Sequence, residues 1–317
     1  MVLAETPELP PELTPDRIFT SWTPDPAALV VVAVLGTAYW LGVRRLRAGG
    51  ESWSTARTAA FFGGLATIAL VTMSFLGVYA DALFWARAVQ NTTLLMIAPL
   101  LLAIGAPLSL LVRSAPQQLA ERTTTCIRSK PAQLLTFPGV VTALLVGVPF
   151  ALYLTPLYEL TLRSSVIDAA MRGMLVFAGF VYFWTRLRVD PTPRDDPHVV
   201  SFGISLAEVI FDGVLGLVLW LGPLRAPHYY EALARTWGPS LRTDQIIAAG
   251  VVWIGGDLAG LPFLGALMRQ WKRDDAQEAA EIDRTLDAQE EEQPDEPAAS
   301  SGLWWEDDPI LAERFRR

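Results

Sequence analysis

Several ionisable side chains lie inside long apolar stretches of this sequence, where a charge is costly. Asp168 and Arg172 are spaced i, i+4, which places them on one face of a helix in a suitable geometry for an ion pair. Glu208 precedes Asp212 by one turn in another stretch, and Asp257 lies inside a third. Charges within membrane helices usually pair with one another or line a wet cavity. These residues are therefore candidates either for a functional site or for a purely structural charge cluster.

Other residue patterns that support chemistry are sparse in the sequence. The single cysteine, Cys126, allows neither an intrachain disulfide nor a pair of thiolates for a metal. The two histidines, His198 and His228, are expected in loops on opposite sides of a membrane, where they cannot share a metal. The sequence contains no HExxH motif, no GxSxG motif and no plausible nucleophile–histidine pair. We therefore expect the protein not to be an enzyme.

The elements that carry the charged residues are apolar segments of membrane-spanning length. Hydrophobic residues make up 52% of the chain and charged residues 18%, which is unusual for a soluble protein. A helix of about 20 residues crosses a bilayer core, and membrane helices tolerate the prolines and glycines found here. The candidate segments lie near 26–43, 58–80, 91–112, 132–154, 166–185, 202–222 and 245–268. This pattern predicts an all-α protein, a polytopic membrane helix bundle with about seven transmembrane helices.

Positively charged side chains are distributed unevenly between the connecting segments. The loops after the first, third and fifth segments, together with the stretch past the seventh, hold fourteen Arg and Lys residues. The N-terminal segment and the other three loops hold six. Because positively charged loops tend to stay in the cytoplasm, we expect the N-terminus outside and the C-terminus inside.

The same pattern divides the chain into three parts. Residues 1–25 are expected to form an extracytoplasmic N-terminal segment, and residues 26–273 a seven-helix membrane domain. Residues 274–317 are expected to form an acidic, largely disordered cytoplasmic tail, because eleven acidic residues and one basic residue lie between 274 and 297. The adjacent Trp304 and Trp305 suit either the inner headgroup region or a docking partner. Nothing in this charge distribution suggests nucleic-acid binding.

Several short stretches occur together in a distinctive order along the chain. They are LLMIAPLLLAIGAP at 94–107, LTPLY at 154–158, VDPTPR at 189–194, Asp244-Gln245 with Gly250, Trp253 and Asp257, and Gln270-Trp271 followed by Asp274 or Asp275. In this order and spacing they resemble the cytochrome c oxidase assembly proteins of the CtaG type, in particular the actinobacterial branch. The resemblance covers roughly residues 12–285.

This resemblance implies a seven-helix protein of the bacterial plasma membrane that supports assembly of a haem–copper oxidase. It implies a role in bringing copper to the copper B centre of the oxidase. The implied partners are a nascent haem–copper oxidase subunit or other oxidase biogenesis factors, within the lipid bilayer. The family presents histidines near the outer ends of helices, as an HxxxH pair, an HxxxHxH set and a single residue. Spacing i, i+4 places two imidazoles on one helix face, and imidazole is a suitable copper ligand.

This sequence carries other residues at each of those family metal-site positions. They are Arg87 and Asn91 at the third helix, Asp168, Arg172 and Met174 in the fifth, and Asp212 in the sixth. Arginine has no free lone pair for a metal, and carboxylate or amide oxygens match Mg²⁺ or Ca²⁺ better than Cu(I). The thioethers of Met174 and Met96 are soft donors, but membrane methionines mostly serve packing. We expect Asp168 and Asp212 to neutralise Arg87 and Arg172.

Two functions remain open at this point. One is a CtaG-type oxidase assembly factor, or a divergent paralogue, that lacks the histidine copper site and acts by contact between membrane proteins. Copper is then a cofactor by family resemblance alone. The alternative is an ion- or proton-coupled membrane transporter that uses the intramembrane carboxylates.

Overall fold

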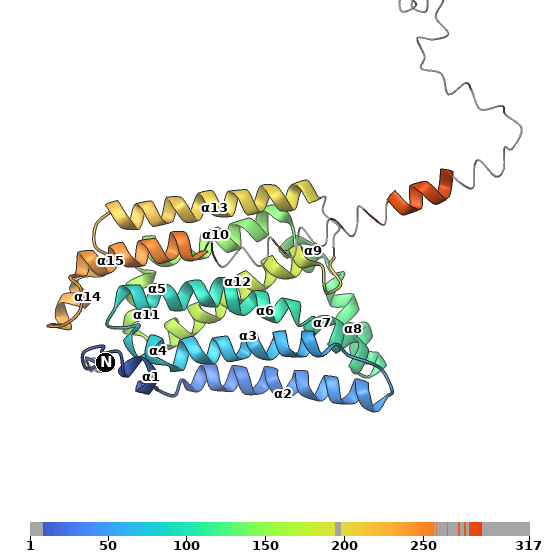
Figure 1. The fold of residues 1–317 in the computed structure, drawn as a ribbon, viewed down its shortest axis with the longest axis horizontal. Helices are drawn as coiled ribbons and strands as arrows, with labels where there is room; N and C mark the ends of the chain where they lie inside the picture. The colour runs from blue at the N-terminus through green and yellow to red at the C-terminus, as the bar shows by residue number, and fades with distance from the viewer. Residues whose placement is uncertain are drawn as a thin grey trace, which may run out of the picture. The chain divides into compact units, whose positions relative to one another are not determined.

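Every regular element in the described part of the chain is helical (Figure 1). The structure, a computed structural model, describes residues 9–193 and 198–256 and a few later positions, which are 258, 265, 272, 276 and 279–286. The chain divides into two units, Met1–Leu267 and Met268–Arg317. The helical bundle belongs to the first unit.

The bundle contains short and long helices in the following order. They are α1 (Arg17–Thr20), α2 (Pro26–Ala48), α3 (Thr55–Met73), α4 (Phe75–Tyr79), α5 (Phe84–Thr92), the π-helix η1 (Thr93–Ile97), α6 (Ala98–Ile104), α7 (Pro107–Ser114), α8 (Gln117–Ile127), α9 (Lys130–Leu135), α10 (Pro138–Leu154), α11 (Leu157–Arg163), α12 (Ser165–Leu187), α13 (His198–Leu221), α14 (Pro227–Ala232), α15 (Leu241–Gly250) and the π-helix η2 (Val251–Gly255).

Four helical stretches are long and apolar enough to cross a membrane. They are Pro26–Ala48, Thr55–Met73, Phe84–Ser114 and Ser165–Leu187. The helices α10 and α11 meet at a bend of 72° and form a fifth candidate if they are counted as one span. The structure therefore has four or five candidate membrane spans, which is the pattern of a multi-pass membrane protein. The seven predicted crossings are not shown by this criterion.

The difference between five and seven spans arises in the last two predicted segments. Segment 202–222 coincides with α13, but its described apolar part is the shorter helix Val209–Leu221. Segment 245–268 begins in α15 and η2, and most of its residues after 256 lie outside the described residues. Both segments are thus helical where the structure describes them, and their crossing of the membrane stays a prediction.

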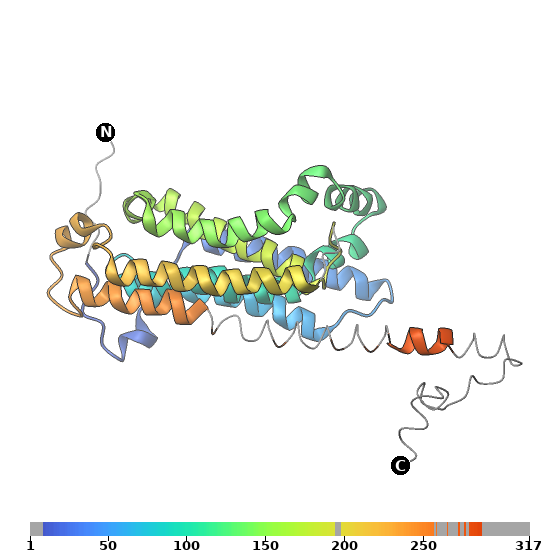
Figure 2. The ribbon, with the colours of Figure 1, turned by 90° about the horizontal axis from the view of Figure 1, so that it is seen from above.

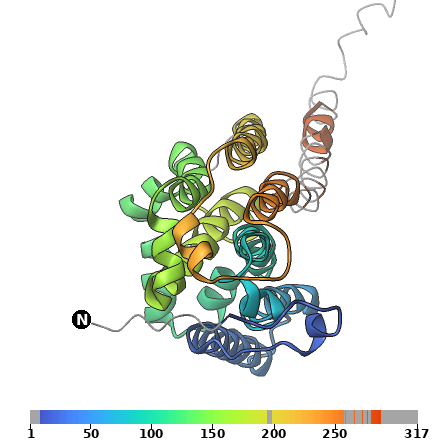
Figure 3. The same ribbon diagram turned by 90° about the vertical axis from the view of Figure 1, so that its left-hand side faces the viewer.

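The run α5–η1–α6 lies in the interior of the bundle, and Figures 2 and 3 show the other long helices around it. Helix α6 packs against α3 and α12, while α5 packs against α15. Glycines bring these helices close, because a Cβ atom on Gly179 of α12 would lie 1.9 Å from the carbonyl oxygen of Leu95 in η1. A Cβ atom on Gly64 of α3 would lie 2.9 Å from the carbonyl oxygen of Ala98. Small residues at such positions are typical of helix packing in membranes.

Two carboxylates remote in sequence cap the ends of this interior run. Asp244 accepts hydrogen bonds from the backbone N–H groups of Phe84 (3.1 Å) and Trp85 (2.9 Å), at the start of α5. Asp190, in the loop after α12, accepts from the N–H groups of Leu108 (3.0 Å) and Ser109 (2.7 Å), at the start of α7. These donors have no partner within their own helices, so the carboxylates satisfy them.

The pKa of Asp190 is also shifted. Burial raises the pKa of the Asp190 carboxyl above its ordinary value, and the hydrogen bonds from Ser109 and Leu108 oppose part of that shift. The sequence motifs at 189–194 and 244–245 therefore each contain a residue whose role in the structure is to hold the interior run of helices in place.

The second unit is described only in part. Residues 279–286 are helical, and the described positions before them are isolated. Most of the predicted tail 274–317, including Trp304 and Trp305, lies outside the described residues. Its disorder and its cytoplasmic location stay predictions.

Candidate functional site

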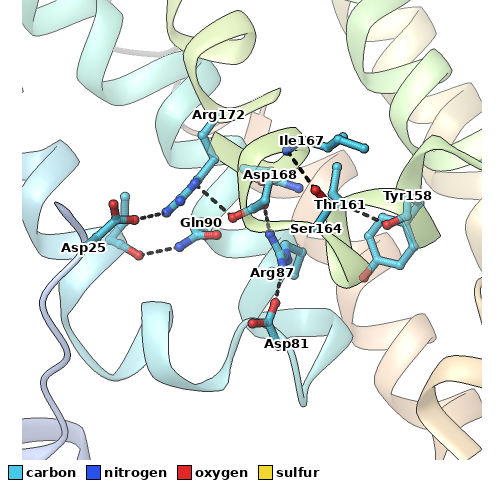
Figure 4. A network of polar contacts seen from close by, with 12 residues as sticks. Asp25, Asp81, Arg87, Gln90, Tyr158, Thr161, Ser164, Ile167, Asp168 and Arg172 are labelled. Carbon is cyan, nitrogen blue, oxygen red and sulfur yellow. Dashed lines mark hydrogen bonds and ion pairs between the residues drawn. The ribbon is translucent and has the colours of Figure 1, made fainter. Parts of the chain in front are cut away.

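Five charged side chains form a continuous chain of ion pairs at the end of the bundle where α2, α5 and α12 begin (Figure 4). The guanidinium group of Arg87 on α5 contacts Asp81 through Nη2 and Asp168 of α12 through Nη1. The other oxygen of Asp168 lies 3.1 Å from Nε of Arg172, and Nη1 of Arg172 lies 2.5 Å from Oδ2 of Asp25. We call these five residues the charge network.

Local helix chemistry positions the members of the charge network. Asp25 is the N-cap of α2, where its Oδ1 accepts from the N–H of Ala28 at 2.9 Å while Oδ2 holds Arg172. One carboxylate thus starts α2 and ties it to α12. Asp168 and Arg172 are one turn apart on α12, as predicted from their spacing. Arg87 lies in the first turn of α5, whose start is held by Asp244.

The charge network contains three carboxylates and two guanidinium groups, so its formal charge is −1. Arg87 is 2% exposed, and its two carboxylate partners compensate the cost of burying a cation. Next to it, Gln90 is 1% exposed and donates from Nε2 to the carbonyl oxygen of Val71 at 2.8 Å. Gln90 Oε1 and Arg87 Nε have no hydrogen-bond partner within the described residues. The site therefore combines paired charges with two unsatisfied polar atoms.

The charge network lines a large open cavity. Its volume is about 1100 Å³, and its walls come from the start of α2, the segment around Asp81, the start of α5, α11 and the start of α12. Hydroxyl side chains such as Thr161, Ser164 and Ser165 add to its polar lining. Solvent or a ligand can therefore reach these charges, although each arginine is already paired.

The structure separates the six predicted metal-site residues into three environments. Arg87, Asp168 and Arg172 belong to the charge network, as described above. Asn91 and Asp212 line a second, much smaller cavity of about 20 Å³ together with Met96, and Asn91 Nδ2 donates to the hydroxyl of Tyr153 at 3.0 Å. Met174 lies on the outer face of α12 with 43% of its surface exposed.

The expected pairing of Asp212 with the two arginines is thus replaced by another arrangement. Arg87 and Arg172 pair with Asp25, Asp81 and Asp168, while Asp212 lies beside Asn91. The side chain of Glu208 and the whole of Asp257 lie outside the described residues, so their predicted roles stay predictions.

The donor atoms near these positions do not fit a Cu(I) site. The charge network offers hard carboxylate oxygens and protonated guanidinium groups, neither of which suits Cu(I). Within the described ranges, no group of three or more His, Cys, Asp or Glu side chains is arranged to hold a metal ion. The histidines were expected in loops, but His198 starts α13 and His228 lies exposed in α14. Because α13 is 24 residues long, roughly 36 Å of helix separates the two ends at which they lie.

Sequence reasoning missed two carboxylates and an amide of the site. Asp25 had a local signal, since Asp followed by Pro marks a helix start, but nothing in the sequence indicated its ion pair with Arg172. Asp81 and Gln90 lie near Arg87 in sequence and gave no signal of their own. Their importance depends on where α12 approaches α5, which is a property of the tertiary structure.

The fold and the charge network together define the class: a multi-pass helical membrane protein with an ionic site at one end of its bundle. The family model of the cytochrome c oxidase caa3 assembly factor (Caa3_CtaG) matches residues 37–274. This chain therefore belongs to that family.

Three mycobacterial proteins are similar to most of the chain. Uncharacterized proteins of Mycobacterium leprae (strain TN), Mycobacterium bovis and Mycobacterium tuberculosis are each 28% identical to it over 289 residues. The aligned region covers 89% of this chain and 44% of each relative. The chain thus spans less than half the length of the curated relatives it matches. No solved structure matches it.

Proposed function

We propose that this protein assists the assembly of a haem–copper oxidase in the bacterial plasma membrane without ligating copper itself. It would act by contact with a nascent oxidase subunit or another biogenesis factor, and it would have no enzymatic activity. In this proposal the chain crosses the membrane seven times, with the N-terminus outside and the acidic tail in the cytoplasm. The charge network then lies near the outer surface of the membrane.

The observation that carries the proposal is the identity of the residues in the charge network. Arg87, Asp168 and Arg172 stand at positions where the resemblance implies histidines, and they contact one another across α5 and α12. A metal bound by histidines from two helices holds those helices together. Ion pairs across the same two helices do so as well. Ion pairs therefore provide a structural replacement for a copper site while the family membership is retained.

Ion- or proton-coupled transport gains less support. A transport path needs polar groups that follow one another across the bundle. The cavity at the charge network and the small cavity at Asp212 have no lining residue in common within the described part of the chain. Asp168 is also occupied by two arginines rather than open to a transported ion.

The test combines a cellular and a biochemical measurement. Deletion of the gene should lower the haem and copper content of the oxidase in isolated membranes, and the wild-type gene should restore both. The purified protein should retain no stoichiometric copper after washing with a chelator. Normal oxidase in the deletion strain would contradict the assembly role.

The copper-free part of the proposal has its own contradicting result. Stoichiometric copper that survives the chelator and is lost in Asp212→Ala or Met174→Ala would show that the family metal function is retained. Glu51→Gln serves as the matched control, because Glu51 belongs to an exposed ion pair with Arg113 that is not part of the charge network.

A further inference from the structure

An apolar groove extends from the charge network along the bundle between α2 and α12. Its volume is about 400 Å³, and α3, η1 and α6 contribute further lining residues. The lining is almost entirely apolar, with Arg172 of the charge network as the charged exception. Ala27, Thr72, Ala169 and Arg172 line both the groove and the large polar cavity. The two spaces therefore adjoin, and together they have an apolar part and a polar part.

The groove opens sideways at the outer surface of two candidate membrane spans. Its lining residues Val31 and Leu35 of α2 and Phe177 of α12 are among the exposed large apolar residues. A Cβ atom on Gly173, also in the lining, would meet no atom within 4 Å. The ion pair of Asp25 with Arg172 joins α2 to α12 at the end nearest the polar cavity. The groove thus faces the hydrocarbon of the bilayer along its side and meets polar groups at its end.

We propose that this site holds one hydrocarbon chain of a phospholipid in the groove and its headgroup in the polar cavity. Size favours a lipid chain over a partner helix. The volume of about 400 Å³ is typical of a small-ligand pocket, whereas a spanning helix is about 10–12 Å wide and has more than five turns.

Charge favours a headgroup that carries an ammonium. The charge network has a formal charge of −1, and its Asp81 side chain is the most exposed member, at 56%. Arg163 also lines the polar cavity, but it is paired with Glu159 at 2.7 Å, so this pair adds no net charge. Gln90, which also lines the polar cavity, contributes the unpartnered acceptor Oε1 and lies between Arg172 and Arg87 in Figure 4. Gln90 Oε1 lacks a donor among the described residues, and Asp81 can accept further hydrogen bonds besides the one from Arg87. Phosphatidylethanolamine supplies such donors and has no net charge, whereas phosphatidylglycerol adds a negative charge to a negative site. The site is therefore selective for phosphatidylethanolamine.

The first arm of the test fills the groove. The full chain, purified in mild detergent, is incubated with phosphatidylethanolamine and analysed by native mass spectrometry. Gly173→Leu places a side chain in the groove and should weaken lipid retention about tenfold, which corresponds to about 1.4 kcal/mol. Gly147→Leu is the matched control, since Gly147 on α10 also has no atom within 4 Å of a built Cβ and does not line the groove. Equal lipid retention in the two variants would overturn the proposal.

The second arm tests the headgroup. Wild type should retain phosphatidylethanolamine in preference to phosphatidylglycerol of the same chains, and Asp81→Asn should reduce that preference. Equal retention of the two lipids by wild type would overturn the assignment of the headgroup.

A photo-crosslinker at position 173 in native membranes identifies the occupant of the groove directly. A lipid adduct supports the proposal, and a protein adduct that displaces lipid overturns it. None of these readouts depends on the oxidase, so they are independent of the proposed function.

Discussion

The start of α5 lies between two ionic sites that differ in how much space surrounds them. On one side, Asp244 is 1% exposed and accepts from two backbone N–H groups and from Arg235 at 3.2 Å. The cavity beside it has a volume of about 10 Å³, which is at the lower limit for a single water. On the other side, Arg87 and its partners line a cavity of about 1100 Å³.

This difference distinguishes a structural charge from one that is available for binding. Backbone N–H groups and Arg235 satisfy the Asp244 carboxylate, and the cavity beside it is too small for a ligand. The charge network also stabilises the bundle, because it joins α2, α5 and α12. It differs in that a wide cavity and the exposed Asp81 leave it able to contact something else. Substitutions at the two sites should therefore separate loss of folding from loss of function.

The largest effect is expected at the enclosed site. Asp244→Ala removes the acceptor of two buried backbone donors and leaves Arg235 without its carboxylate, which should cost about 3–5 kcal/mol of unfolding free energy. Thermal unfolding of the purified protein in detergent measures this loss, with Glu51→Ala as the exposed control. Oxidase assembly should fall only in proportion to the amount of folded protein. A stable variant with no assembly activity would assign Asp244 a direct functional role.

The next effect is expected at the centre of the charge network. Asp168→Ala should cost roughly 2–3 kcal/mol, less than loss of Asp244, because Arg87 keeps Asp81 and water can reach the cavity. The double variant with Arg172→Leu should lose less than the sum of the two single losses, because the pair of Asp168 with Arg172 is lost only once. This coupling energy is the quantity that the double-mutant cycle measures. Additive losses would show that the two side chains do not interact. A variant that folds stably but does not support oxidase assembly would show that the charges serve function beyond folding.

A smaller effect is expected where the charge network meets α2. Asp25→Ser keeps a good N-cap for α2 but removes the ion pair with Arg172, whereas Asp25→Ala removes both. The serine variant should lose about 1 kcal/mol and the alanine variant about 1 kcal/mol more, as read from thermal unfolding. Equal stability of the two variants would show that the capping interaction contributes nothing.

The smallest effect is expected far from both sites. Glu51 and Arg113 form an ion pair at 2.6 Å in which both side chains are about half exposed. Glu51→Gln should change the unfolding free energy by at most about 1 kcal/mol, because exposed pairs contribute little. A loss as large as that of Asp168→Ala would mean that exposure is a poor guide to the strength of these pairs.

The sequence allowed the helical nature of the protein and one contact of the site to be predicted. Apolar segment length indicated the helices, and the i, i+4 spacing indicated the pair of Asp168 and Arg172, because both are local properties of the chain. The contact of Arg87 with Asp168 joins α5 and α12, which are distant in sequence, and no spacing rule reaches that far. The placement of Asp212 beside Asn91 instead of the arginines has the same cause. Only the family resemblance, which places Arg87 and Asp168 at one site, indicated that these two residues lie close together.

The number of spans was less predictable for a different reason. Hydropathy recognises apolar length but not direction, so the bend of 72° between α10 and α11, which decides between four and five spans, has no counterpart in the hydropathy profile. The step from five to seven depends on the last two segments, of which one has a short apolar part and the other lies mostly outside the described residues. The helix caps at Asp190 and Asp244 were likewise invisible, since each carboxylate satisfies backbone donors of a helix far away in the chain. The motifs that contain Asp190 and Asp244 were recognised in the sequence, but the capping of α7 and α5 by these carboxylates was not predicted.

The π-helix η1 has a consequence for how this chain tolerates insertion and deletion. A π-turn accommodates about one more residue than the α-helical turn it replaces, and each residue of an α-helix rotates the next by about 100°. Deleting one residue within Thr93–Ile97 would therefore restore a regular helix while α5 and Ala98–Ile104 keep nearly the same faces toward their neighbours. In a regular membrane helix the same deletion rotates every later residue by about 100° and turns its faces away from their partners. Homologous chains that lack one residue in this stretch are therefore expected to keep Arg87 and Asn91 directed toward the same neighbouring helices.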